Sequence, residues 1–224
     1  MSRIGDNLRS VEDRIDKAAQ RSGRKREDIT LVTVTKTRSV EEIREAIACG
    51  ATDIGENYVQ EAGEKFAQIG DSARWHFIGH LQRNKARHAV EVFSVIHSVD
   101  NAALAAEIGR RAELIGRRVD VLIEVKISGE ETKFGVGPEA AVDLAGEIAQ
   151  VSGIRVCGLM GMAPFLENPQ YTGPYFSDLK KLWDKLPVEQ RLYLSMGMTS
   201  DFEVAIAEGS NMVRIGTAIF GPRG

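Results

Sequence analysis

The feature that most constrains the fold is a regular alternation of strand-like and helix-like segments along the 224-residue chain. Short runs rich in β-branched or apolar residues predict strands, and a segment with helical signals follows almost every one. Strands that alternate with helices are joined by crossover connections, which make them parallel. The predicted strands are residues 29–35, 52–54, 75–78, 95–98, 119–125, 154–160, 192–195 and 212–215.

The predicted helices begin with an amphipathic segment over residues 4–21, in which Ile4, Leu8 and Val11 recur at helical spacing. Ser39 with Glu42 and Ser200 with Glu203 have the spacing of capping boxes, which mark helix starts. Pro174 is expected to close a polar loop over residues 164–174. The other helices are predicted over residues 39–47, 58–69, 83–92, 102–115, from 137 onward, 175–186 and 204–207.

Eight is the number of parallel strands that closes a (β/α)8 barrel. An open doubly wound sheet is the structural alternative, but no Gly-x-Gly-x-x-Gly motif follows an early strand. The chain ends at Gly224, which leaves no room for a full eighth helix, and the extra N-terminal helix could take that place. We therefore predict an α/β (β/α)8 TIM barrel with an extra N-terminal helix, and one domain over residues 1–224.

Composition excludes several classes of protein. With 43% hydrophobic and 27% charged residues the chain can build a core, and disorder is not expected. The net charge is −3 and no basic block occurs, which argues against a nucleic-acid partner. Cys49 and Cys157 are far apart, which argues against a disulfide framework or a zinc ribbon. Neither a signal peptide nor an apolar stretch of bilayer length is apparent, so we expect a cytoplasmic protein and no membrane partner.

Catalytic and binding residues of a barrel lie at the C-terminal ends of its strands, and Lys36 follows the first strand there. It comes after the apolar run of residues 31–35, so it is expected to project from an apolar wall. Desolvation disfavours the charged amine, and a neutral amine can form an imine with an aldehyde. The alternative is a lysine that extends its ammonium group to water.

The loops after the last two strands predict an anion site. Thr199 and Ser200 follow one strand, and Gly216 and Thr217 follow the other. Barrels often bind phosphate between these loops, where N–H groups face the anion, hydroxyls add donors and a glycine allows close approach. Ordinary capping by Ser200 explains that residue without any ligand, but it does not explain Gly216 and Thr217.

Arg214 lies within the last strand, and a buried arginine needs a partner. That partner is either a carboxylate of the protein or the ring nitrogen of a bound heterocycle. An imine-forming lysine, a phosphate cradle and an arginine for a pyridine nitrogen together describe a site for pyridoxal 5'-phosphate (PLP).

Other polar residues near strand ends allow more than one interpretation. His76 and His80 share a face of one strand but have no third ligand, so a metal site is not predicted. His80 is a candidate pocket residue, whereas His88 and His97 are expected at the surface or in packing. Asn57 either binds a ligand or caps the next helix. Methionines such as Met196 are more often core residues than functional ones.

Five motifs resemble one protein family. They are Val34-Thr35-Lys36, residues 55–61, residues 75–82, Leu194-Ser195-Met196-Gly197-Met198 and Val213-Arg214-Ile215-Gly216-Thr217. Because these motifs occur in this order, the chain resembles the YggS/PROSC family of pyridoxal phosphate-binding proteins along essentially its full length. That family is similar to the N-terminal barrel of alanine racemase, a fold-type III pyridoxal enzyme.

The resemblance implies Lys36 as the imine lysine and Arg214 at the pyridine nitrogen, with Thr199, Gly216 and Thr217 at the phosphate. Ser200 joins the cofactor-binding set through the anion site above. The resemblance also implies that Asn57, His80 and Met196 line the cofactor. The function it implies is intracellular PLP homeostasis, with indirect effects on amino-acid balance. The partners it implies are PLP-requiring apoenzymes as candidate recipients, and the expected oligomeric state is a monomer or weak homodimer.

Two positions depart from the family pattern as we expect it. Thr199 stands where serine is expected, and it keeps the hydroxyl. Lys126 stands where asparagine is expected, near Glu124 at the end of the fifth strand. A second cation that pointed into the barrel mouth could compete as an amine or attract the phosphate.

A binding protein without catalytic activity is expected rather than an enzyme. Racemisation needs a carbanion stabilised by the ring and an acid/base group on each face. An arginine at the ring nitrogen does not favour ring protonation, and alanine racemase brings a second domain that supplies the opposing tyrosine. A weak PLP-dependent amino-acid racemase and an imine-forming barrel aldolase for sugar phosphates are the alternatives.

Overall fold

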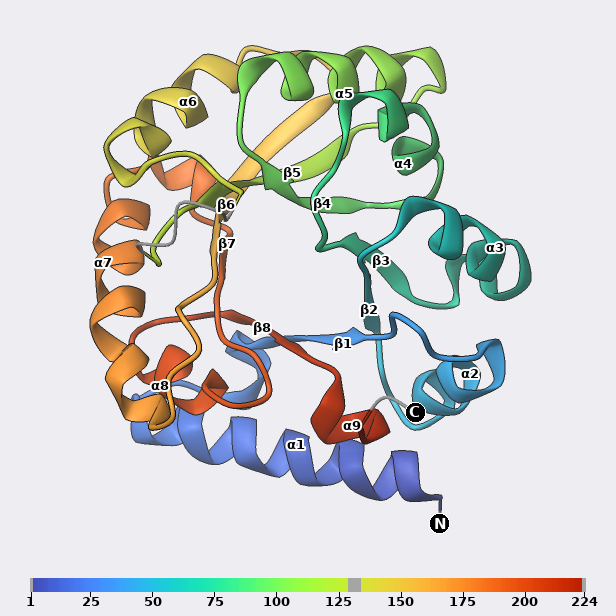
Figure 1. Cartoon of the computed structure of the whole chain (residues 1–224), viewed down its shortest axis with the longest axis vertical. Helices are drawn as coiled ribbons and strands as arrows, with labels where there is room; N and C mark the ends of the chain where they lie inside the picture. Colours follow the sequence, from blue (N-terminus) through green and yellow to red (C-terminus); the bar gives the residue numbers. More distant parts are fainter. Residues whose placement is uncertain (1, 129–133, 223–224) are drawn as a thin grey trace.

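The computed structural model describes residues 2–128 and 134–222, and within them eight parallel strands close a barrel (Figure 1). Each strand pairs with the next along the chain, and the last pairs with the first. This confirms the predicted (β/α)8 barrel and excludes the open sheet. The strands are β1 Thr30–Val34, β2 Asp53–Glu56, β3 Arg74–Phe77, β4 Val95–Val99, β5 Val119–Val125, β6 Ile154–Gly161, β7 Tyr193–Ser195 and β8 Met212–Ile215.

Helices surround the barrel as an outer ring (Figure 1). The Ser39–Glu42 capping box is confirmed: the Ser39 hydroxyl accepts from the Glu42 N–H at 3.2 Å, and Glu42 accepts from the Ser39 N–H at 2.9 Å. The α-helices in the described part of the chain are α1 Arg3–Arg21, α2 Val40–Ala48, α3 Val59–Ile69, α4 Ala86–Val92, α5 Ala102–Leu114, α6 Ala141–Ile148, α7 Gly173–Trp183, α8 Phe202–Ala207 and α9 Thr217–Phe220.

Side-chain alternation along the strands builds two separate cores. Val121 and Ile123 of β5 belong to the large apolar cluster between the barrel and its helices. Leu122 lies between them in sequence and belongs to a small cluster with Cys157 and Met160. Because successive residues of a strand point to opposite faces, this small cluster occupies the barrel interior. The rest of the interior is strongly polar, which bears on the site.

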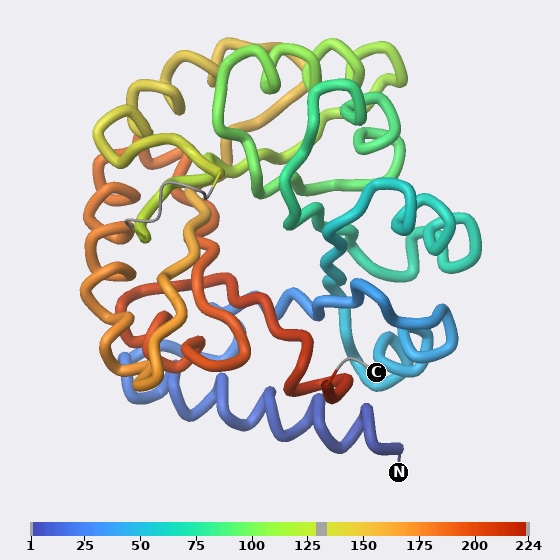
Figure 2. Tube along the Cα trace, in the orientation of Figure 1, coloured from blue at the N-terminus to red at the C-terminus, as the bar shows by residue number. Residues whose placement is uncertain are grey.

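Helix α1 fills the gap left by the short α9, as the sequence predicted. It runs along the outside of the barrel beside α8 and α9, close to the C-terminal segment (Figure 2). Ser2 caps it by accepting from the Gly5 N–H. Its buried face, which includes Ile15, packs with Phe202 of α8, Val213 of β8 and Phe220 of α9. The helix therefore covers the seam where β8 meets β1.

Four predicted helix starts differ from the structure. Helices α4 and α6 begin at Ala86 and Ala141, each after a single 3-10 turn near the predicted start. Helix α7 begins at Gly173, with Pro174 inside its first turn, where a missing N–H costs nothing. Helix α8 begins at Phe202 rather than after a Ser200 cap, and its N-cap residue is Asp201. The Asp201 carboxylate accepts from the Met198 N–H at 2.6 Å, and the backbone N–H of Asp201 bonds to the Met198 carbonyl. This tight turn makes a serine cap unnecessary.

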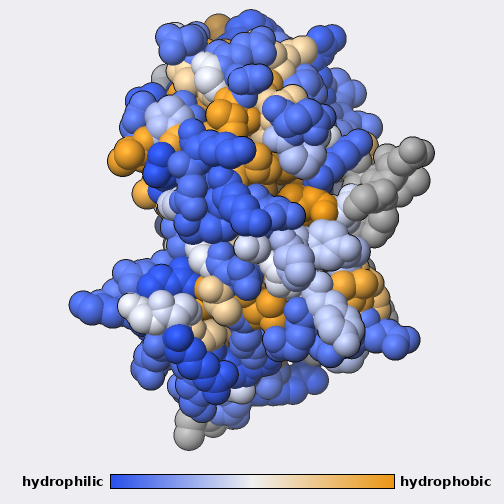
Figure 3. Space-filling view, turned by 90° about the vertical axis from the view of Figure 1, so that its left-hand side faces the viewer, coloured by the Kyte–Doolittle hydropathy of each residue, from blue (hydrophilic) through white to orange (hydrophobic). Residues whose placement is uncertain are grey.

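The surface is mainly hydrophilic on the face shown in Figure 3, with apolar residues interspersed. No helix in the described ranges has the length and apolar character needed to cross a membrane. Cys49 is exposed and Cys157 is buried, and both are free cysteines. The described residues also contain no group of histidine, cysteine and carboxylate side chains that could hold a metal ion.

Replacing Ile15 with alanine tests the role of α1. Ile15 is fully buried, so Ile15→Ala is expected to lower the free energy of unfolding by about 2–5 kcal/mol. Urea unfolding measures this change, with Lys17→Ala on the exposed face of the same helix as the control. An Ile15→Ala variant as stable as the control would show that α1 does not help to close the barrel.

Candidate functional site

A cavity of about 350 Å³ opens at the C-terminal ends of the strands. This volume lies in the range of small-molecule sites. Its apolar wall comes from Val34, Ile78, Met162 and Met198. The predicted binding residues that line it are Lys36, Asn57, Thr199, Ser200, Arg214, Gly216 and Thr217. The structure thus brings together side chains from both ends of the sequence.

The pairing of β1 with β8 places Lys36 beside the predicted phosphate loop. Val32 lies opposite Arg214 and Thr33 opposite Ile215 in this parallel pair. Gly216 follows where the backbone packs tightly against the end of β1, because a Cβ atom there would lie 3.1 Å from the Val34 carbonyl oxygen. Close strand packing therefore gives Gly216 a structural reason that the sequence analysis did not identify.

Arg214 is 4% exposed, and its guanidinium group points across the barrel interior. It donates to the Ser195 hydroxyl at 2.6 Å and to the Gly161 carbonyl at 3.2 Å. Burial lowers the pKa of Arg214 to about 10, while Asp201 and Glu124 oppose this shift. The side chain is therefore still a cation at neutral pH, and its donors are fixed in direction.

A chain of buried polar groups extends from Ser195 toward the other end of the barrel. The Ser195 hydroxyl lies 3.1 Å from Nδ1 of His97, and Nε2 of His97 lies 2.9 Å from Nδ1 of His76. Nε2 of His76 lies 2.9 Å from Oδ1 of Asp53. Burial lowers the pKa of both histidines, that of His97 well below its ordinary value. Neutral imidazoles therefore link Asp53 indirectly to Arg214.

This network of polar groups was not predicted from the sequence. His97 was expected at the surface or in packing, and the structure places it fully buried in a polar network. The available signal was the strand period, which puts His97 on the same face as Val95, a residue of the small interior cluster. His88 is exposed beside Glu91, which fits the surface alternative.

Asn57 does not cap α3, because the N-cap residue is Tyr58. Its Oδ1 atom is buried and has no hydrogen-bond partner among the described residues. Gly79 lets the end of β3 pack against Asn57, since a Cβ atom there would lie 2.3 Å from the Asn57 carbonyl oxygen. A buried acceptor without a donor at a cavity wall favours the ligand-binding interpretation of Asn57.

His80 and Met196 are the predicted residues that do not line this cavity. His80 is exposed, and its ring stacks on Phe134 with centroids 3.5 Å apart. It lines a neighbouring cavity of about 550 Å³ that shares Asn57 with the first. Met196 is fully buried in the large apolar cluster. Because Ser195 points into the barrel, strand alternation turns Met196 outward.

Similar proteins identify the family. A family model described as alanine racemase, N-terminal domain, matches residues 7–224. The pyridoxal phosphate homeostasis protein of Aquifex aeolicus is 45% identical, and the match covers 97% of each chain. The chain belongs to the pyridoxal phosphate homeostasis protein family.

Solved structures agree with this assignment. The structure of PipY from Synechococcus elongatus with PLP bound has a TM-score of 0.83 and 35% identity, covering 97% of this chain and all of that one. An alanine racemase of Clostridium difficile has a TM-score of 0.74 at 21% identity, covering 97% of this chain and 57% of that chain. The second likeness shows that the family shares the barrel fold of alanine racemase. The resemblance stated from the sequence motifs is thus confirmed.

In this member of the pyridoxal phosphate homeostasis protein family, a buried carboxyl group lies near Arg214. Glu124 is 5% exposed. Burial raises its pKa to about 7; Asp100 adds to the rise, and Arg214 and Lys126 oppose it. Lys126 is not among the residues that line the 350 Å³ cavity.

The raised pKa of Glu124 predicts a specific pH dependence of stability. The folded protein binds a proton at Glu124 more tightly than the unfolded chain does. The contribution of this proton to the free energy of unfolding is complete below pH 4.5 and is lost as the pH rises to about 7. The free energy of unfolding of Glu124→Gln relative to wild type should therefore rise by about 3 kcal/mol over this interval. Urea unfolding at a series of pH values in this interval measures the change, with Glu113→Gln at an exposed position as the control. A difference that does not vary with pH would contradict the prediction.

Proposed function

We propose that this protein binds PLP in the cavity at the C-terminal ends of the strands, holds it as a Schiff base of Lys36, and takes part in intracellular PLP homeostasis. The observation that carries the proposal is the meeting of Lys36, Arg214 and the hydroxyl-bearing loops around one cavity. The name of the Aquifex relative and the PLP bound to PipY support it.

The residues that line the cavity fit the chemical groups of PLP. The Lys36 amine would add to the aldehyde carbon, and one water would leave as the C=N bond forms. The Arg214 guanidinium would donate to the ring nitrogen. The hydroxyls of Thr199, Ser200 and Thr217 and the backbone at Gly216 would bind the phosphate. The buried, unpaired Oδ1 of Asn57 is an acceptor that a donor on the ligand would satisfy.

We further propose that this site holds PLP without turning over an amino acid. A guanidinium donor at the ring nitrogen leaves that nitrogen unprotonated, which weakens the ring as an electron sink. Ser195 and Gly161 fix the guanidinium in place, and its lowered pKa of about 10 still keeps it charged at neutral pH. The same proposal includes PLP-requiring apoenzymes as recipients of the cofactor and a cytoplasmic location. It also includes one domain over residues 1–224 and a monomer or weak homodimer.

Replacing Lys36 tests the covalent link. Wild-type protein with PLP is expected to show a yellow imine absorption band, and Lys36→Ala is expected to lose it completely. Borohydride reduction followed by mass spectrometry should place the pyridoxyl group on Lys36. Lys126→Ala, which removes a lysine that follows β5 and does not line the cavity, is the matched control and should keep the full band. A pyridoxyl group on another lysine, or a colourless wild type, would refute the proposed link.

Deuterium exchange at the α-carbon of amino acids tests the absence of turnover. Because the ring is a weak electron sink and no carbanion is stabilised, wild type should exchange no faster than Lys36→Ala. Nuclear magnetic resonance of L- and D-alanine in deuterium oxide measures the rate. Exchange well above that of Lys36→Ala would favour the slow racemase instead.

A further inference from the structure

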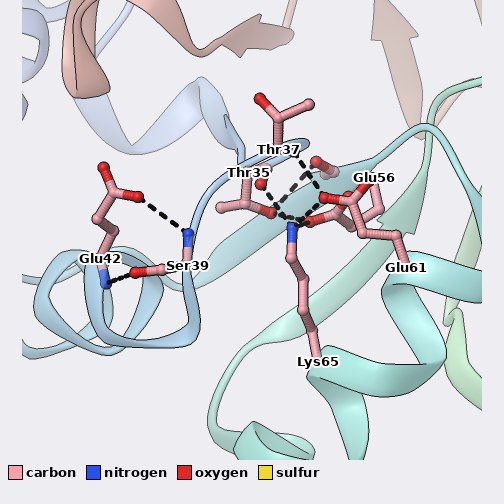
Figure 4. A network of polar contacts seen from close by, with 8 residues as sticks. Thr35, Thr37, Ser39, Glu42, Glu56, Glu61 and Lys65 are labelled. Atoms are coloured by element: carbon pink, nitrogen blue, oxygen red, sulfur yellow. Dashed lines mark hydrogen bonds and ion pairs between the residues drawn. The ribbon is translucent and has the colours of Figure 1, made fainter. Parts of the chain in front are cut away.

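A cluster of three charged side chains, with Lys65 and Glu56 buried and Glu61 partly exposed, contacts Thr35 and Thr37 of the turn that carries Lys36 (Figure 4). Lys65 of α3 is only 6% exposed. Its ammonium group lies 2.7 Å from Oε1 of Glu56 and 2.7 Å from Oε1 of Glu61. A lysine is rarely buried to this degree unless it is paired, so the two carboxylates explain how the ammonium group is tolerated there.

This cluster binds the residues on both sides of Lys36. The Lys65 ammonium group donates to the Thr35 carbonyl at 2.8 Å, and the Thr35 hydroxyl donates to Glu56 at 2.7 Å. On the other side of Lys36, the backbone N–H of Thr37 donates to Glu61 at 2.6 Å. The main chain is therefore held immediately before and immediately after the lysine.

The backbone at this point has an unusual conformation. Arg38 N–H bonds to the Thr35 carbonyl at 3.0 Å, which closes a four-residue turn with Lys36 in its second position. Thr37 in the third position has φ 63°, and it is the one non-glycine residue of the described chain with positive φ. A β-branched residue rarely adopts this conformation, so surrounding contacts must hold it.

The turn is also held from the C-terminal side. The Arg38 guanidinium donates to the carbonyl oxygens of Gly221 and Pro222, at 2.6 and 3.2 Å. These residues follow α9, which begins at Thr217 in the cavity wall. The segment that carries Lys36 is thus connected both to α3 and to the segment that follows Gly216 and Thr217.

We propose that Lys65 and Glu61 are positioning residues for Lys36: they fix the turn at Thr35 and Thr37, and thereby hold the Lys36 amine where it can attack the PLP aldehyde. The inference rests on the proposed function, since it assigns a role in imine formation at the same site. Neither residue lines the cavity, so both act through the backbone of the turn. Holding a reacting group in place contributes strongly to rate, and misplacement by about 1 Å can cost a factor on the order of a hundred.

Glu61 offers the sharper test, because its side chain is 26% exposed and its removal does not leave a cavity in the core. Glu61→Ala removes the acceptor for the Thr37 N–H. Glu61→Gln keeps an acceptor oxygen and serves as the conservative variant. Glu64→Ala removes an exposed carboxylate from the same helix and is the matched control.

Two ligands separate positioning from folding. The rate of imine formation with PLP is followed by absorbance, and binding of pyridoxine 5'-phosphate is measured by calorimetry. The second compound has an alcohol in place of the aldehyde, so it reports the non-covalent contacts alone. Glu61→Ala is expected to slow imine formation at least about tenfold while its affinity for pyridoxine 5'-phosphate stays within about twofold of wild type. Glu61→Gln should recover most of the rate, and Glu64→Ala should match wild type.

Three results would overturn the inference. An unchanged imine rate in Glu61→Ala would show that the turn does not depend on Glu61. A parallel loss of imine rate and pyridoxine 5'-phosphate affinity would make its role merely structural. Equal losses in Glu61→Ala and Glu61→Gln would remove the role given to the Thr37 hydrogen bond. Failure of the proposed function is a distinct result, because wild type itself would then form no imine at Lys36.

Discussion

The pairing of β8 with β1 is the interaction on which the site depends. The two strands come from opposite ends of the sequence, and their register sets Val32 opposite Arg214. Closure places Lys36, which follows β1, in the same cavity wall as Gly216 and Thr217, which follow β8. Helix α1 covers this seam with an apolar face that includes Ile15, so the extra helix protects the pairing that creates the cavity. Without closure, the amine and the phosphate loop would lie at opposite edges of an open sheet.

The barrel interior combines little apolar packing with many satisfied polar groups. The chain from Asp53 through His76 and His97 to Ser195 ends on the guanidinium of Arg214. Buried polar groups are costly unless they are hydrogen-bonded, and a satisfied network restricts each member to one orientation. Ser195 and Gly161 in the barrel interior therefore fix the orientation of the Arg214 guanidinium group. In the same way, the cluster around Lys65 is proposed to fix the position of Lys36. Both groups proposed to meet PLP are held by partners outside the cavity.

Sequence reasoning found the residues whose positions follow from strand ends alone. Lys36 and Gly216 were predicted because each follows the C-terminal end of a strand, and Arg214 because it lies just before such an end. His80 and Met196 were assigned to the cofactor through the family resemblance, and the structure places them outside the cavity. Strand alternation turns Met196 into the core. The contacts of Lys65 with Thr35 and Glu56 could not be predicted, since helical spacing does not show which buried lysine meets which carbonyl group.

The sequence by itself determined the number and order of the strands, the helices between them and before the first, the parallel sheet and the family. These properties follow from local periodicity and from motifs that are continuous in the chain. Only the tertiary structure decided that β8 closes on β1, that His97 faces Ser195, and that Glu61 binds the backbone beside Lys36. The reason is physical: local preferences act over a few residues, whereas these contacts join residues tens to hundreds of positions apart and exist only after the barrel has closed.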